Sequence, residues 1–189
     1  MTRFRYFAAC LLMAFCMPVS AADRIRVVAE GGIRDEWTLP PGYKLAMPVY
    51  PAARAEQRAE VCVAIGYLIN PDGSTSDFAL LKSWTSADIS RSDLGYWADF
   101  ANAAAEALSQ WHFQPRSEVK TPRPVYTVAT MLFAAGSPAS RSHCAVPNPA
   151  IRLRELSQDS NTRRKMGALF DRLELDPLRE QNTTRQPRM

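Results

Sequence analysis

Residue types that build catalytic and metal sites are scarce in this sequence. Its 189 residues include only two histidines, four cysteines and eight glycines. Few histidines and cysteines leave little material for a metal site or for a nucleophile paired with a base. Scarce glycine also leaves few loops that cradle phosphate groups. We therefore expect no enzyme, no metal and no cofactor.

A strong charge of either sign is also missing. The formal net charge is +4, which is too weak a field to indicate nucleic acid as a partner. What the chain does have is 47% hydrophobic residues and 22% charged residues, a balance typical of a folded protein. A length of 189 residues allows one domain and little more.

The first 22 residues have the pattern of a secretory signal peptide. Their only charges are Arg3 and Arg5, residues 6–17 form an uncharged apolar run, and small residues at 20–22 suit signal peptidase. The alternative is an uncleaved membrane anchor, but a run of about 16 residues is short against the ~20 that span a bilayer. Cleavage after Ala22 would leave an exported chain with a net charge of +2.

Cleavage would also remove two of the four cysteines and leave Cys62 and Cys144. An exported chain with two cysteines most simply carries one disulfide. The bridge would close a loop of about 80 residues, for which loop entropy gives a stabilisation of about 4 kcal/mol. Two separate free thiols are the alternative.

The spacing of apolar residues predicts the regular elements. In chain order we expect an extended lead-in with a short strand around Ile25 and Val27, a short helix, a strand, a turn, a return strand, a helix and a third strand. Their ranges are 23–47, 51–60, 61–69, 70–73, 76–83, 92–111 and 125–133. Residues 134–149 have the composition of a loop. Residues 150–189 are predicted to be a charged tail that is partly helical and partly disordered.

The order helix, strand, strand, helix, strand predicts an α+β fold of two layers. The sheet would be small, antiparallel and three-stranded, with helices packed on one face and the helical tail added at the C-terminus. One strand of such a sheet lies at an edge with unpaired backbone groups.

The most specific pattern in the sequence is a set of seven residues between positions 48 and 133: Tyr50, Pro51, Asp72, Gly73, Trp111, Phe113 and Pro115. Together with the strand before Asp72 and the strand that ends at Phe133, their order and spacing resemble the TonB C-terminal domain. Each residue also has a plain structural reason, since Pro starts helices, Asp-Gly suits a turn and the aromatics join a helix to a sheet. The pattern therefore favours fold determinants over ligand contacts.

The resemblance implies a periplasmic docking module that is not an enzyme. An extended segment of an outer-membrane transporter, or of another envelope protein, would add to an edge strand by β-augmentation. By that resemblance the docking edge is the last strand, with the residues Val125, Tyr126, Thr127, Val128, Ala129, Thr130, Met131 and Leu132. The alternative is that the chain's own tail, residues 134–180, covers this edge. An exposed edge would also make a homodimer possible.

The chain departs from a full energy transducer of that family. Residues 1–22 contain no histidine, and residues 23–49 are too short for a linker that crosses the periplasm. A transducer with an uncleaved anchor is the alternative to a soluble binding module, and a small secreted hydrolase is a remote third hypothesis. Membrane contact would be at most peripheral, through Arg163, Arg164 and Lys165, for which a solvated helix face is the plainer interpretation. His143 and Cys144 alone do not make a metal site.

Overall fold

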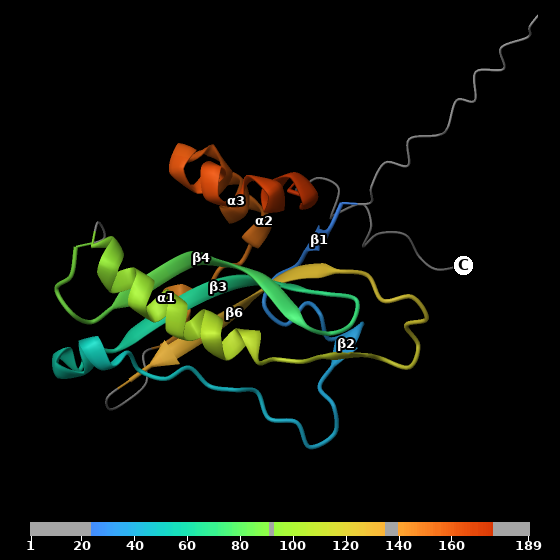
Figure 1. The fold of residues 1–189 in the computed structure, drawn as a ribbon, viewed down its shortest axis with the longest axis horizontal. Helices are drawn as coiled ribbons and strands as arrows, with labels where there is room; N and C mark the ends of the chain where they lie inside the picture. The colour runs from blue at the N-terminus through green and yellow to red at the C-terminus, as the bar shows by residue number, and fades with distance from the viewer. Residues whose placement is uncertain (1–23, 91–92, 135–139, 176–189) are drawn as a thin grey trace, which may run out of the picture.

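The computed structural model describes residues 24–90, 93–134 and 140–175, so the predicted signal peptide and the end of the tail lie outside the described residues. Six strands and three longer helices follow one another, with two short 3-10 helices between them (Figure 1). The strands are β1 (Arg26–Val27), β2 (Trp37–Thr38), β3 (Val61–Ile69), β4 (Thr75–Thr85), β5 (Gln114–Pro115) and β6 (Val125–Phe133). The helices are η1 (Ala52–Gln57), α1 (Leu94–Ser109), η2 (Arg141–Cys144), α2 (Pro149–Gln158) and α3 (Ser160–Arg172).

The main sheet has four strands in the order β1-β6-β3-β4. β3 is central and pairs antiparallel with β4 and with β6, from Val61 opposite Phe133 to Ile69 opposite Val125. β1 pairs parallel with the start of β6. The prediction of three strands with the last one at the edge is therefore wrong, because the lead-in supplies a fourth strand beyond β6. A second small sheet joins β2 to β5.

Helices cover both faces of the main sheet. One apolar cluster joins α1 to Val61, Val63 and Ile65, and a second joins η2, α2 and α3 to Cys62, Ala64 and Leu68 of β3. The predicted single helical face is wrong for a visible reason. Every residue of β3 is buried, since its second face also carries small or apolar side chains that need a cover. The tail provides that cover with its two helices, α2 and α3.

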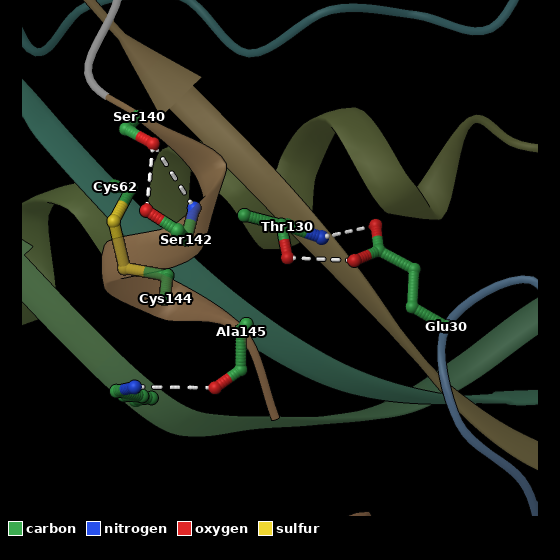
Figure 2. The surroundings of a disulfide bond; sticks show 8 residues. Glu30, Cys62, Thr130, Ser140, Ser142, Cys144 and Ala145 are labelled. Atoms are coloured by element: carbon green, nitrogen blue, oxygen red, sulfur yellow. Dashed lines mark hydrogen bonds between the residues drawn. A yellow bond between two sulfur atoms is a disulfide. The ribbon is translucent and has the colours of Figure 1, made fainter. Parts of the chain in front are cut away.

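The predicted disulfide is confirmed. Cys62 and Cys144 are bonded, with their Cα atoms 6.0 Å apart, and neither side chain is exposed (Figure 2). The bond joins the start of the central strand β3 to the end of η2, which precedes α2 in the chain. It therefore anchors the whole helical tail to the second face of the sheet.

The two ends of the described chain are held together. Ile25 forms a parallel bridge with Leu173, in which the Ile25 amide donates to the Arg172 carbonyl at 2.8 Å and the Glu174 amide donates to the Ile25 carbonyl at 2.8 Å. Ile25, Val27 and Leu173 are all buried in the second cluster. The lead-in is thus clamped between β6 and the end of α3.

Candidate functional site

The strand predicted as the docking edge lies inside the sheet. β6 is flanked by β3 on one side, and at Val125 and Tyr126 by β1 on the other. All of residues 125–131 are buried, and only Leu132 of the predicted edge is partly exposed. A partner that docks on β6 would have to displace the lead-in.

Residues 28–30 continue the cover along the outer side of β6. The Val28 amide donates to the Tyr126 carbonyl at 2.9 Å, and the Thr127 hydroxyl donates to the Ala29 carbonyl at 3.2 Å. The Glu30 carboxylate then accepts from both the amide (2.9 Å) and the hydroxyl (2.8 Å) of Thr130, as Figure 2 shows. The lead-in thus closes this edge, and from the described part of the tail Arg141 adds an ion pair to Glu30 at 2.6 Å.

We expect Glu30→Ala to lower the free energy of unfolding by about 1–2 kcal/mol, because the nearly buried Thr130 amide loses its acceptor. Urea unfolding monitored by circular dichroism measures this change. Glu36→Ala is the matched control, since Glu36 pairs with Arg26 at a site where both side chains are at least 40% exposed. An equal loss of unfolding free energy in both variants would show that the hydrogen bonds from Thr130 to Glu30 stabilise the fold no more than an exposed ion pair does.

The turn and the helix end that carry the family motif meet in space. The Phe113 amide donates to the Gly73 carbonyl at 2.9 Å, and the Thr75 hydroxyl donates to the Leu108 carbonyl at 2.7 Å. Asp72 closes the turn by accepting from the amide and hydroxyl of Ser74, and these hydrogen bonds hold the pKa of Asp72 below its usual value. Residues about 40 positions apart in the sequence thus form one joint between the β3–β4 turn and the end of α1.

The remaining motif residues also contact the protein itself. The Tyr50 ring packs edge-on against Phe100, with centroids 5.3 Å apart, and its hydroxyl donates to the Ala59 carbonyl. The Trp111 indole donates to the Ala46 carbonyl at 2.8 Å. Pro115 pairs with Trp37 in the small sheet, and Pro51 precedes η1. These contacts are those of residues that hold the fold.

The opposite edge of the main sheet belongs to β4, and no strand pairs with its outer side among residues 24–90, 93–134 and 140–175. Its last residues, from Lys82 to Thr85, pair with β3 in unbroken register. The Ser86 amide donates to the Glu60 carbonyl, so the alternation of an antiparallel ladder turns the backbone groups of Ser83 and Thr85 outward. All four residues of this stretch are partly or fully exposed. We call residues 82–85 the open edge.

The other half of β4 is less suited to pairing. The register shifts twice, and Asp77 has a φ of +53°, so β4 is bent there. The Leu81 carbonyl is already taken, since the Arg152 Nε donates to it at 2.7 Å. The open edge is therefore the stretch of β4 whose backbone is better suited to pair with an added strand.

Two hollows lie beside the open edge, between β4 and the start of α2. One, of about 450 Å³, is lined by Leu80, Leu81, Lys82, Ser83 and Arg152, and the other, of about 330 Å³, by Lys82, Arg152 and residues of the η2–α2 region. Lys82 and Arg152 line both hollows. We call these hollows the edge groove, and it provides side-chain contacts next to free backbone groups.

The local sequence explains how the groove forms. Asn148 caps α2 by accepting from the Ile151 amide, and Pro149 occupies the first turn, so α2 begins at a fixed point beside β4. The Lys82 ammonium donates to the Ala145 carbonyl at 3.1 Å, which ties β4 to the segment after the disulfide. Both anchors hold the groove walls at a set distance.

Several titratable side chains of the described residues have structural contacts. Within the described part of the chain, no three His, Cys, Asp or Glu side chains converge as metal ligands. His143 stacks on Trp84, with ring centroids 3.9 Å apart, while Asp93 caps α1 and Asp99 pairs with Arg54. Across the same residues no helix is long and apolar enough to cross a membrane.

Sequence reasoning missed the open edge and the groove. One signal was available, because the return strand carries Lys82 and several hydroxyl side chains, and such residues are typical of edge strands. The groove had no local signal, since Lys82 and Arg152 come together only through the packing of α2.

Comparisons with known proteins identify the TonB C-terminal domain among solved structures. The solution structure of the Pseudomonas aeruginosa TonB C-terminal domain is 22% identical over 50% of this chain and 85% of that chain, with a TM-score of 0.39. The solution structure of the Helicobacter pylori TonB C-terminal domain is 21% identical over 48% of this chain and 71% of that chain, with a TM-score of 0.33. No protein-family model and no curated protein sequence matches the chain. Both solved structures are of the family that the motifs between residues 48 and 133 resemble.

Proposed function

We propose that this chain is a periplasmic, non-enzymatic binding module that docks an extended segment of an envelope protein. The observation that carries the proposal is the open edge, where Ser83 and Thr85 turn unpaired backbone groups toward solvent beside a groove. Strand addition uses such groups for affinity and neighbouring pockets for selectivity. The resemblance to TonB C-terminal domains suggests an outer-membrane transporter as the partner.

The docking edge in this proposal is β4 rather than β6. Adding a strand to β4 leaves every existing hydrogen bond of the sheet in place. Adding one to β6 requires Ile25 and Val27 to leave the core, and burying two aliphatic side chains of this size stabilises the fold by about 3–6 kcal/mol. The open edge is thus the lower-energy site for a partner.

Photo-crosslinking in cells tests the proposal. With a photoreactive residue at position 83 of the full chain, we expect crosslinks that map by mass spectrometry to one extended segment of an envelope protein. The same residue at Arg164, exposed on α3, is the control position and should give no such product. Crosslinks of equal yield from both positions, or none from position 83, would contradict docking at the open edge.

Proline substitutions then separate the two edges. Ser83→Pro removes an outward amide without deleting a bond to β3, and we expect it to abolish the crosslinked product of a neighbouring position such as Thr85. Val128→Pro makes the equivalent change on β6 and should leave that product unchanged in folded protein. Loss of the product in Val128→Pro alone would assign docking to β6.

N-terminal sequencing of the protein from cells tests the localisation. We expect a start at Asp23, in agreement with a cleaved signal peptide. A start at Met1 with the protein in the inner membrane would instead favour the alternative of an anchored energy transducer.

A further inference from the structure

We infer that the segment docked at the open edge is acidic, with a carboxylate held between Lys82 and Arg152 and an apolar side chain placed on Ile151. This inference rests on the proposed function, and it adds the chemistry that the groove would select. It starts from the two cations that both hollows share.

Lys82 and Arg152 present hydrogen-bond donors at the mouth of the groove. The Lys82 side chain is exposed and uses one of its three N–H groups on the Ala145 carbonyl. Arg152 uses Nε on the Leu81 carbonyl and one terminal nitrogen on Glu155, and its side chain stays 41% exposed. Donors therefore remain on both side chains, and both charges are accessible to a carboxylate from solvent.

The charge balance of the groove favours an anion. Glu155 is the one carboxylate in its lining, and it is already paired with Arg152 at 2.9 Å. Two cations against one anion leave a net charge of +1. Like charges close together are unfavourable, so a basic segment would be rejected here.

The second wall of the groove is apolar. Ile151 is 43% exposed, although it is a large aliphatic residue, and it lies beside Val146 and Pro147. An added strand alternates its side chains, so residues two apart face the same side. A segment with an apolar residue two positions from an Asp or Glu would place both against the groove at once.

Synthetic peptides test the inference on the mature protein. The probes are two ten-residue peptides of alternating valine and threonine, identical except that one carries two central glutamates and the other two central glutamines. We expect the glutamate peptide to bind about fivefold more tightly in low salt. NMR shifts should map to the amides of Ser83, Thr85 and Ile151, and the preference should shrink as salt is added.

Charge variants identify the residues that read the peptide. The readout is the ratio of the dissociation constants of the two peptides measured on the same variant, and Lys82→Gln is expected to lose most of the preference for glutamate. The matched control is Arg164→Gln with Lys165→Gln, two exposed charges on α3, which should keep the preference. If the control variant loses the preference for the glutamate peptide to the same extent, the preference comes from the net charge of the protein and not from the groove. That result would overturn the inference.

The outcomes distinguish this inference from the proposed function. Equal binding of both peptides at Ser83 and Thr85 would overturn the acidic preference and leave the docking edge supported. Binding of neither peptide would also overturn it, and crosslinking from position 83 would still decide the proposed function.

Discussion

A Gly73→Ala variant is expected to lose about 2–5 kcal/mol of unfolding free energy, a large part of the stability of a domain of this size. The backbone of Gly73 has a φ of +87°, and a Cβ there would lie 1.8 Å from the Phe113 carbonyl oxygen. Left-handed backbone costs a non-glycine residue about 1–2 kcal/mol, and overpacking adds about 1–3 kcal/mol or more. The clash is with backbone, so no rotamer change relieves it.

Gly42→Ala is a control that separates the two causes. Gly42 has a similar φ of +74°, but a Cβ there would meet nothing within 4 Å. We expect a loss of about 1 kcal/mol from the backbone conformation alone. Urea unfolding of both variants, monitored by tryptophan fluorescence, gives the difference. Equal losses would mean that the β3–β4 turn and the end of α1 are not joined as described.

Removing the disulfide should have an effect of similar size. Replacing Cys62 and Cys144 together with alanine is expected to lower the unfolding free energy by about 4 kcal/mol, because the bridge closes a long loop whose entropy in the unfolded chain rises once it opens. Hydrogen exchange should locate the change. Amides of η2, α2 and α3 would exchange faster, and those of β3 and β6 would change least.

A substitution in the same segment serves as the control. Ser142→Ala removes an exposed hydroxyl that bonds to Ser140, and its effect should stay within about 0.5 kcal/mol. Thiol titration of the denatured, non-reduced mature protein should find no reactive thiol. Two reactive thiols, or an unchanged unfolding free energy in the double variant, would contradict the stabilising role of the bridge.

Helices and strands in which apolar residues recur at a regular spacing were predictable from the sequence. The strands 61–69 and 125–133 have the predicted bounds, and α1 lies within the predicted helix 92–111. The short strand at Ile25 and Val27 was expected as well, but its partner was not. Parallel pairing with β6 joins residues about 100 positions apart, and nothing in the alternation of the lead-in encodes that partner.

The layout of the helices was partly encoded and was misjudged. Cys62, Ala64 and Leu68 make the second face of β3 apolar, which indicates a strand buried on both sides. The polar composition of residues 150–189 concealed that α2 and α3 each place an apolar stripe, with Leu153, Leu169 and Phe170, on that face. The edge groove could not be predicted, since it exists only where this packing brings Arg152 to Lys82.

The bridge between Ile25 and Leu173 also affects the order in which parts of the fold form. A chain that leaves the ribosome or a membrane channel N-terminus first exposes Ile25 and Val27 about 150 residues before Leu173 follows. Contacts between such distant segments form late in folding. Closing the long loop between them costs entropy, and the contacts that offset this cost form only when both segments are present. Until then the lead-in is held on β6 only by its own contacts with that strand and lacks the bridge to Leu173, so a newly delivered chain passes through an interval in which β6 is less firmly covered against strands of other chains.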